Sequence, residues 1–328
     1  MRASLLAATL LTRAASFSAP TRVISGLRDL VDDYDVFLLD QFGVLHNGGA
    51  LMPGVASALE TLANRGKRLV VLSNTSGRRH VVERKLPTQG FDAAWLAGVV
   101  TSGELAYREL SSARWRGKRC VLLGWDRGSP EDDAFLDGTG AALAGGFDDA
   151  ELLVAQGPDT IVTSAAARVR TRARESGDLA PYLAGLRGCA ARGVPMLVCN
   201  SDLVALSPEG RRWTMPGALA QRYEGFGGPT VHFGKPRAAP FALAVELAGG
   251  AAARVCHVGD SVEHDVAGAH AAGVASVFVV ETGIHRADAE SAGWVLPGGG
   301  VGGAAAAAAV ASGAGVPAPT YALAKFAW

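Results

Sequence analysis

Two apolar, strand-like runs in this 328-residue chain are each followed by an aspartate, with a glycine nearby that permits a sharp turn. The first run, Phe37-Leu38-Leu39, is followed by Asp40. The second run ends in Val258-Gly259 and is followed by Asp260, more than two hundred residues later. In an open parallel sheet, side chains at the carboxyl ends of the strands meet at one edge, where ligands bind. Two carboxylates that converge there are oxygen ligands of the kind that Mg²⁺ prefers. The alternative at this stage is that each aspartate caps the helix that follows it.

Two further segments bring other polar groups to strand ends. Residues 67–76 have the pattern of a strand that ends in the cluster Ser73-Asn74-Thr75. These side chains and the free backbone N–H groups are suited to hold an anion where the next helix begins. Lys235 follows a short strand-like run and precedes a helix. A single lysine in such a place is more often a solvated surface charge, but the order aspartate, serine-asparagine, lysine, glycine-aspartate-serine favours a site.

With this order of motifs the chain resembles the haloacid-dehalogenase-like hydrolase superfamily, over about residues 29–328. It is most similar to the class that has a large α/β cap between the second and third motifs, the nitrophenyl-phosphatase-like and pyridoxal-phosphatase-like enzymes. The fourth motif, Gly259-Asp260-Ser261 with Asp265, is a specific match. The tract Cys199-Asn200-Ser201-Asp202 also resembles the class pattern that precedes the lysine motif.

The resemblance implies a Rossmann-like, doubly wound parallel-sheet core with an inserted α/β cap domain. We assign residues 26–112 and 229–328 to the core and residues 113–228 to the cap, and the alternation of strand and helix patterns agrees with this division. The core is expected to resume with a strand at Thr230–Phe233. Residues 298–315 are almost all Gly and Ala and are predicted to be a loose surface insertion. A homodimer formed through the cap is a further expectation.

The resemblance also implies a role for each motif residue. Asp40 would be the nucleophile that becomes an aspartyl-phosphate, which divides one hard displacement into two easier ones. Lys235 would pair with Asp40 and with the phosphate, and so offset the charge of the transition state. Ser73 and the Asn74 backbone would hold the transferring phosphoryl oxygens, and Thr75 belongs to the same cluster.

A magnesium site and a substrate-binding loop follow from the same resemblance. Mg²⁺ would be held by Asp40, Asp260 and the backbone carbonyl of Phe42, and Asp265 would orient this shell or the lysine. Asn200 and Asp202, in the tract that resembles the cap loop of the class, are candidates for substrate contact. Their alternative is an ordinary turn, because Asn-Ser-Asp is common turn chemistry.

The chain departs from the family pattern at Phe42. A second aspartate normally stands there, and it protonates the leaving alcohol and later activates water. A phenyl ring cannot move a proton, and losing general acid–base help costs a factor of roughly 10²–10⁴. A phosphatase without it should be slow, or restricted to good leaving groups such as phenolates and acyl phosphates. His46, six residues after Asp40, is a candidate substitute proton carrier, with a plain loop histidine as the alternative.

The function implied is a Mg²⁺-dependent phosphohydrolase that acts on a small phosphorylated metabolite. Two alternatives stay open. Dehalogenases of the same superfamily have Asp-x-Tyr-Gly where this chain has Asp40-Gln41-Phe42-Gly43, and they expel halide without a proton or a metal. Asp260, a metal-ligand carboxylate, and the phosphatase type of cap argue against that reaction. The third reading is a family member that binds a phosphorylated ligand without turnover.

Composition excludes several other partners. The 31 basic and 31 acidic residues give a net charge of +0, so no basic field favours nucleic acid or an anionic membrane. A run of 18 or more apolar residues, which a membrane span requires, is absent from the sequence. The four cysteines lack metal-ligand spacing and are expected to be buried free thiols.

The first 25 or so residues differ from the rest of the sequence. They contain no acidic residue, but they contain Arg2, Arg13 and Arg22 and several hydroxyl residues. This composition is typical of an organellar transit peptide, for a plastid or a mitochondrion. The alternative is the untargeted N-terminus of a cytoplasmic enzyme.

Overall fold

The computed structural model describes residues 20–126, 128, 134–164, 167–207, 209–249 and 254–328. The chain divides into two compact units that are each discontinuous in sequence. The core unit contains the chain up to Ser73, Glu83–Val100 and Lys235–Trp328, and the cap unit contains Asn74–Val82 and Thr101–Gly234. The cap unit therefore begins earlier than the predicted boundary at residue 113, and it includes most of the polar cluster that follows Ser73.

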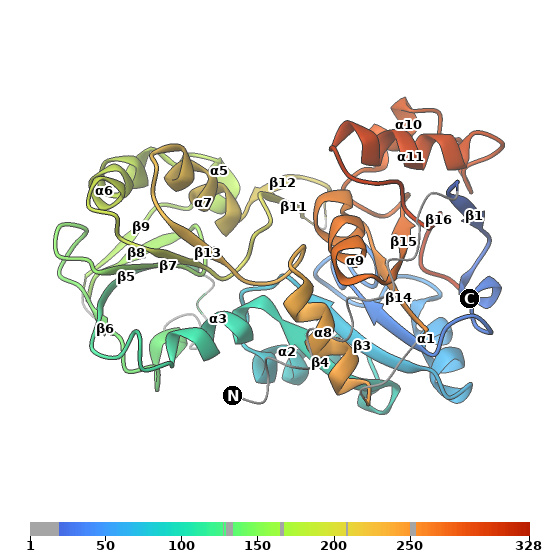
Figure 1. Cartoon of the computed structure of the whole chain (residues 1–328), viewed down its shortest axis with the longest axis horizontal. Coiled ribbons are helices and arrows are strands. Elements are labelled where there is room, and N and C mark those ends of the chain that lie inside the picture. Colours follow the sequence, from blue (N-terminus) through green and yellow to red (C-terminus); the bar gives the residue numbers. More distant parts are fainter. Residues whose placement is uncertain (1–19, 127, 129–133, 165–166, 208, 250–253) are drawn as a thin grey trace. The chain divides into compact units, whose positions relative to one another are not determined.

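The core unit is built on a sheet with the strand order β1-β16-β15-β14-β2-β3-β4 (Figure 1). The pairings from β1 across to β3 are all parallel. From β2 the chain moves to β3 on one side, whereas β14 pairs with β2 on the other side. The crevice at such a reversal of strand order is where open α/β sheets bind ligands. The strands are β1 (Arg22–Ile24), β2 (Val36–Leu39), β3 (Arg68–Ser73), β4 (Leu96–Thr101), β14 (Val255–Gly259), β15 (Ala275–Val279) and β16 (Tyr321–Leu323).

Helices cover this sheet, as predicted for a doubly wound core. The central strands β2 and β14 are buried along their whole length, which suits apolar runs covered on both faces. Helix α8 contacts β2 and β3 and packs against α9, which contacts β15, while α1 contacts β3 and α11 lies over β1 and β16 (Figure 1). The helices of this unit are α1 (Val55–Asn64), α8 (Ala238–Leu247), α9 (Ala267–Ala272), α10 (Arg286–Ser291) and α11 (Gly303–Gly313); α2 (Arg79–Lys85) spans the boundary between the units.

The Gly- and Ala-rich residues 298–315 are not the loose insertion that their composition predicted. They contain α11, whose Ala306, Ala307 and Ala311 are buried in a cluster with Phe278 of β15 and Ala322 of β16. Alanine has the highest helix propensity, and its small side chain lets a helix approach a sheet closely. The low complexity of this segment therefore encodes a packed helix.

The cap unit has its own sheet, in the order β13-β10-β7-β5-β8-β9, with β6 paired to the beginning of β5. Strand β8 pairs antiparallel with both β5 and β9, and the other pairings of this sheet are parallel. A separate antiparallel pair is formed by β11 and β12. The strands are β5 (Arg119–Gly124), β6 (Ala142–Leu143), β7 (Leu152–Ala155), β8 (Thr160–Val162), β9 (Arg168–Arg170), β10 (Met196–Val198), β11 (Val204–Leu206), β12 (Arg212–Thr214) and β13 (Thr230–His232).

Strand β13 corrects the prediction that the core resumes at Thr230–Phe233. It pairs with β10 at the edge of the cap sheet, and the chain enters the core unit only at Lys235. The helices of the cap unit are α3 (Ser102–Leu110), α5 (Ala173–Ser176), α6 (Ala180–Ala191) and α7 (Pro216–Gly225). Helix α3 is capped at its start, where the Thr101 hydroxyl accepts the N–H of Glu104 at 3.1 Å.

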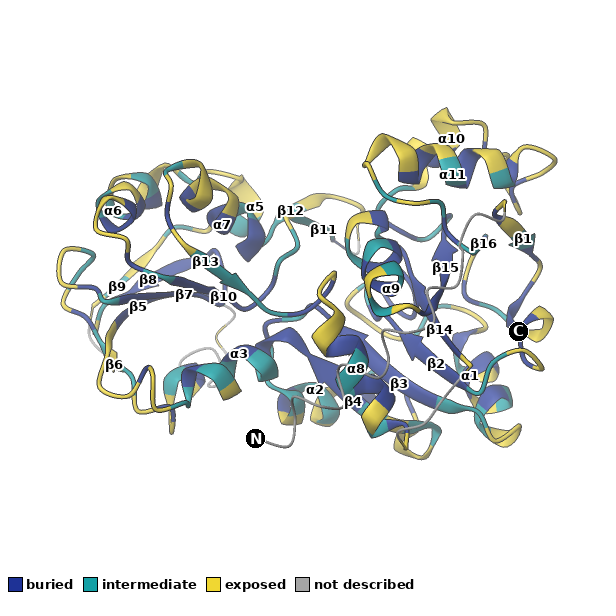
Figure 2. Cartoon of the chain, viewed as in Figure 1, coloured by how far each residue is buried: buried dark blue, intermediate teal, exposed yellow. Residues whose placement is uncertain are grey.

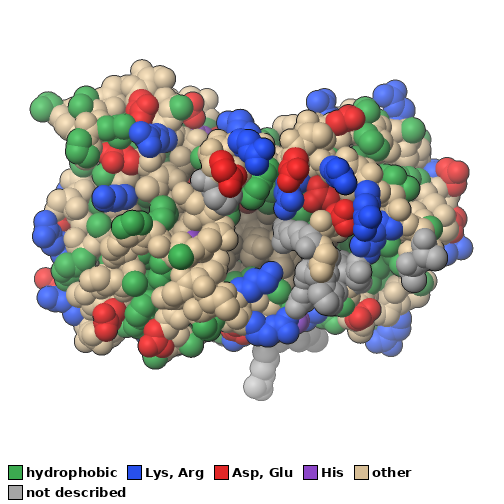
Figure 3. Space-filling view, turned by 180° about the vertical axis from the view of Figure 1, so that it is seen from behind, with side chains coloured by type: hydrophobic (Ala, Val, Ile, Leu, Met, Phe, Trp, Pro, Cys, Tyr) green, Lys and Arg blue, Asp and Glu red, His purple; other side chains and the backbone are tan. Residues whose placement is uncertain are grey.

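Burial and charge agree with the sequence analysis. The central strands of both sheets are buried, whereas the outer sides of the helices are exposed (Figure 2). All four cysteines are buried and free, as predicted. Among the described residues, no helix combines the length and apolarity that crossing a bilayer requires. Basic and acidic side chains are interspersed on the face drawn in Figure 3.

Residues 1–19 lie outside the described residues, so most of the predicted presequence falls there. The described chain, however, enters the fold before the predicted boundary at residue 25. Arg22–Ile24 form β1, which pairs with β16, and the buried Thr21 hydroxyl donates to the Pro319 carbonyl at 2.8 Å. Cleavage after residue 25 would therefore remove an edge strand of the core sheet.

Protein that lacks residues 1–25 is expected to be less stable than protein that lacks residues 1–19. The longer truncation removes β1, the Thr21 hydrogen bond and the buried Ile24, and the apolar burial alone contributes about 1.5–3 kcal/mol. Scanning calorimetry of the two proteins at the same pH measures the difference as a lower unfolding midpoint for the longer truncation. Equal midpoints would show that β1 does not stabilise the core.

Candidate active site

A buried lysine joins two of the predicted aspartates. Lys235 is 2 % exposed, and its Nζ donates to Oδ1 of Asp40 at 2.7 Å and to Oδ1 of Asp265 at 2.6 Å. The alternative of a solvated surface lysine is therefore wrong. Burial by itself would lower the pKa of Lys235, but the charges of Asp265 and Asp40 outweigh it and raise the pKa. The ammonium group stays charged at neutral pH.

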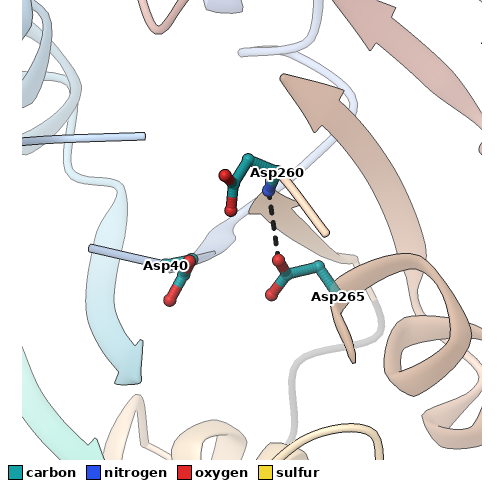
Figure 4. Close-up of side chains that lie close together, drawn as sticks. All are labelled: Asp40, Asp260 and Asp265. Carbon is teal, nitrogen blue, oxygen red and sulfur yellow. Dashed lines mark hydrogen bonds between the residues drawn. The ribbon is translucent and has the colours of Figure 1, made fainter. Parts of the chain in front are cut away.

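Asp265 is held by donors on both of its oxygens. Oδ1 accepts from Lys235 and lies 2.7 Å from Nε2 of His257, and Oδ2 accepts the N–H groups of Asp260 at 3.1 Å (Figure 4) and Ser261 at 2.9 Å. Burial would raise the pKa of Asp265, but the Lys235 charge and these bonds lower it. A carboxylate has about four lone-pair positions, so these contacts favour an orienting role for Asp265 over direct metal ligation.

Asp40 and Asp260 converge as the sequence predicted. Asp40, Asp260 and Asp265 each offer one carboxylate oxygen, and these atoms all lie within 4.8 Å of one another (Figure 4). Asp260 also accepts the N–H of Ile284 at 2.8 Å. Burial, and then the charges of Asp40 and Asp265, raise its pKa well above the usual value. The single positive charge of Lys235 does not balance the repulsion among the three carboxylates. The cluster is therefore suited to bind a divalent cation.

Glycines make this convergence possible. Gly43 has φ +80°, and a Cβ there would lie 2.2 Å from Oδ2 of Asp260. A Cβ on Gly283 would lie 2.4 Å from Cβ of Asp260. The Thr282 hydroxyl donates to the Gly43 carbonyl at 2.7 Å and ties the two turns together. The glycine that follows Asp40 is therefore required both by its backbone conformation and by the second aspartate.

The predicted anion-binding cluster is divided between the two units. Ser73 is buried at the end of β3, next to β2, whereas Asn74 and Thr75 belong to the cap unit. Asn74 Nδ2 donates to Oδ1 of Asp202 at 2.9 Å, and Oδ1 of Asn200 accepts the N–H of Asp202 at 2.7 Å. The structure thus joins three residues that were predicted to contact substrate, and their contact with a ligand stays a prediction.

His46 is buried beside Phe42 instead of lying on an open loop. Its ring meets Phe42 and Phe91 edge-on, with centroids 5.8 and 6.4 Å away. Nδ1 accepts the N–H of Gly48 at 3.0 Å, and Nε2 has no partner among the described residues. Burial lowers the pKa of His46 to about 4, so the ring is neutral at pH 7 and is not a protonated acid. A catalytic role for His46 and a metal-ligand role for the Phe42 carbonyl stay predictions.

The sequence analysis overlooked His257, which lies within β14 and is fully buried. Its Nδ1 is 3.0 Å from the Leu38 carbonyl of β2, and its Nε2 is the atom that contacts Asp265. Burial lowers the pKa of His257, against the opposing effect of Asp265. The available signal was a single polar residue inside the apolar run Val255-Cys256-His257-Val258, since a buried polar group needs hydrogen-bond partners.

Comparisons with known proteins agree with this geometry. A family model described as haloacid dehalogenase-like hydrolase matches residues 37–138, and one described as HAD-hydrolase-like matches residues 232–298. These two segments contain Asp40, Ser73, Lys235 and Asp260. The chain belongs to the haloacid-dehalogenase-like hydrolases. The predicted family and fold class are confirmed.

Curated relatives of this hydrolase match part of its length. A 4-nitrophenylphosphatase of Schizosaccharomyces pombe is 32% identical over 124 residues, which are 37% of this chain and 40% of that protein. A glycerol-3-phosphate phosphatase of Gallus gallus is 36% identical over 108 residues, which are 33% of this chain and 35% of that protein. The chain thus aligns with less than half of each relative.

A solved structure shares the fold over most of the chain. A haloacid-dehalogenase-like hydrolase from Brucella suis 1330 is 25% identical, with a TM-score of 0.69. The alignment covers 81% of this chain and 92% of that structure. The similarity therefore extends well beyond the two segments that the family models match.

Millimolar Mg²⁺ is expected to raise the thermal unfolding midpoint of this protein more at about pH 8 than at about pH 5. Because the pKa of Asp260 is raised in the folded state, the folded protein binds a proton there more tightly, and stability falls as pH rises through that pKa. A cation that binds the ionised carboxylates offsets this loss. Calorimetry with and without EDTA measures the effect.

The Mg²⁺ effect should disappear in Asp260→Asn and persist in Asp32→Asn, a control at an exposed aspartate of the same unit. A midpoint that responds equally in both variants would contradict a cation site at Asp260.

Proposed function

We propose that this hydrolase is a Mg²⁺-dependent phosphatase of small phosphate monoesters. The observation that carries the proposal is the buried ion network in which Lys235 joins Asp40 to Asp265, with Asp260 alongside. A carboxylate nucleophile, a charged lysine and a cation site are the groups that phosphoryl transfer through a carboxylate requires. The names of the two curated relatives, a 4-nitrophenylphosphatase and a glycerol-3-phosphate phosphatase, support the same reaction class.

The reaction proceeds in two displacements at phosphorus. A carboxylate oxygen of Asp40 attacks the phosphorus atom, and the bond to the ester oxygen breaks, so that the leaving group departs with its electron pair. Asp40 then carries the phosphoryl group as an acyl phosphate. Water attacks the same phosphorus, and the bond to the Asp40 oxygen breaks to give inorganic phosphate and free carboxylate. Lys235 lies against Asp40 and offsets negative charge in both steps.

The other residues position the groups that react. Ser73 of the core unit would hold phosphoryl oxygens, and Asn74, Asn200 and Asp202 of the cap unit are the candidates for further substrate contact. Asp40, Asp260 and the Phe42 carbonyl would hold a Mg²⁺ ion. Mg²⁺, when bound, supplies positive charge to the phosphoryl oxygens. Asp265 keeps Lys235 and the turn at Asp260 and Ser261 in place.

Phe42 limits the leaving groups that this site accepts. The position lacks a carboxyl group, and burial keeps the neighbouring His46 neutral at pH 7 because its pKa is lowered to about 4. The ester oxygen therefore departs without a ready proton donor. Phenolates, and the carboxylates released from acyl phosphates, leave well without a proton, whereas alkoxides do not. The enzyme is accordingly slow on alkyl phosphates.

Purified protein is expected to hydrolyse an aryl phosphate in the presence of Mg²⁺. Asp40→Asn should abolish this turnover because the amide is not a nucleophile, and EDTA should suppress it. Asp32→Asn is the matched control and should leave the rate unchanged. Activity that persists in Asp40→Asn or in EDTA would contradict the proposal.

The same assay with haloacids separates the alternatives. Halide release without a metal would identify a dehalogenase, and ligand-dependent stabilisation without turnover would identify a binding protein. The crowded carboxylates of Asp40 and Asp260 favour the phosphatase, because a metal-independent reaction would leave their repulsion only partly offset by Lys235.

Phe42→Asp is expected to raise turnover of alkyl phosphates more than turnover of aryl phosphates. The new carboxyl group can protonate a poor leaving group, which an aryl ester does not need. Rates for a series of esters, plotted against the pKa of the leaving alcohol, should show a steep dependence in the original protein and a shallow one in the variant. The unfolding midpoint must be measured as well, because cutting a packed aromatic costs roughly 3–5 kcal/mol. A stable variant with an unchanged dependence would show that Phe42 does not limit the leaving group.

A further inference from the structure

His257 connects the two strands that carry the candidate active site. It lies in β14 directly opposite Leu38 of β2, two residues before Asp40. Nδ1 is 3.0 Å from the Leu38 carbonyl, and Nε2 is 2.7 Å from Oδ1 of Asp265. The edge contact with Phe241 of α8, at a centroid distance of 5.0 Å, holds the plane of the ring. The imidazole is fully buried, so no solvent can replace either contact.

These contacts form a chain of interactions that leads from His257 to Asp40, the proposed nucleophile. His257 contacts Asp265, Asp265 accepts from Lys235, and Lys235 donates to Asp40. We propose that His257 is a positioning residue that fixes Asp265, and through it holds Lys235 against Asp40. It touches neither the proposed substrate nor the nucleophile. Its effect on the reaction passes through the lysine.

Asp265 needs such a support because its own backbone is irregular. It belongs to η6 (Val262–Val266), a single π-helical turn between β14 and α9, which is a conformation that often occurs at functional sites. Its Oδ2 is fixed by the N–H groups of Asp260 and Ser261. Its Oδ1 contacts only side chains among the described residues, those of Lys235 and His257. Without His257, a buried carboxylate oxygen would depend on a flexible lysine alone.

The inference rests on the proposed function for its kinetic consequence. Lys235 offsets charge that develops during phosphoryl transfer. A misplaced lysine therefore stabilises the transition state less, while the binding of the substrate changes little. Disturbing His257 should therefore lower kcat and leave KM nearly unchanged. A residue that only stabilised the fold would instead lower the amount of active protein without separating these two constants.

Three substitutions of His257 separate the effects of its two polar contacts from the effect of its packing. His257→Phe keeps the shape that packs against Phe241 and removes both polar atoms. His257→Gln places an amide nitrogen as far from Cβ as Nε2, so it can still donate to Asp265. His257→Asn places its nitrogen as far from Cβ as Nδ1, so it can reach only the Leu38 carbonyl. The Gln and Asn variants form a matched pair that differs in which contact survives.

We expect His257→Phe to lower kcat for an aryl phosphate by roughly 10–100-fold, the usual range for residues that support catalytic groups. KM should change by less than about two-fold. His257→Gln should recover most of the lost rate, and His257→Asn should not, at comparable unfolding midpoints. Full activity in His257→Phe, or equal rates in the Gln and Asn variants, would overturn the proposal. The matched pair decides the matter if His257→Phe does not fold.

Crystal structures of the variants test the positioning independently of turnover. The contact between Lys235 Nζ and Asp40 Oδ1 should be retained in His257→Gln and lost in His257→Asn. If the original protein hydrolyses no phosphate ester, the proposed function fails, but this geometric comparison still decides the role of His257. An unchanged Lys235 contact in both variants would overturn the positioning role even in an active enzyme.

Discussion

Three carboxylates and one ammonium group are buried together at the carboxyl ends of β2 and β14, and their electrostatic balance governs the site. Charges removed from water must be paired, and removing one partner of a buried pair commonly costs about 3–5 kcal/mol. Lys235 satisfies Asp40 and Asp265, but burial, and then the charges of Asp40 and Asp265, raise the pKa of Asp260. The remaining negative charge is what makes the site receptive to a divalent cation, and it links folding to the proposed chemistry.

The rest of the core unit places these charges. Parallel pairing of β2 with β14 brings two distant segments of the chain to one edge, where the strand order reverses. At Gly43 and Gly283 the backbone lies so close to Asp260 that any larger residue would clash with its side chain. Asp265 then binds the turn that carries Asp260 and, with His257, holds the lysine. The proposed metal binding and nucleophile placement, together with the charge balance, thus depend on one set of contacts.

Much of this arrangement could be predicted from the sequence. Rigid strands are followed by Asp40 and Asp260, so the convergence of these two side chains follows from strand order. Other features depend on partners that are distant in the chain. The pairing of β13 with the cap sheet is one example, and the packing of α11 on the core is another. His257 was overlooked because its neighbours indicate only a buried strand, and its contacts with Leu38 and Asp265 become visible only when the strands are assembled.

The proposed mechanism depends on Asp40 as the nucleophile that accepts the phosphoryl group. Trapping the aspartyl-phosphate intermediate tests this role most directly. An aryl phosphate is mixed with the enzyme and Mg²⁺, the reaction is quenched in acid within its first turnover, and the peptide that contains Asp40 is analysed by mass spectrometry. The account predicts that this peptide gains the mass of one phosphoryl group, that hydroxylamine removes it, and that Asp40→Asn never acquires it. Release of phosphate without an adduct in the original protein, or an adduct on another residue, would contradict it.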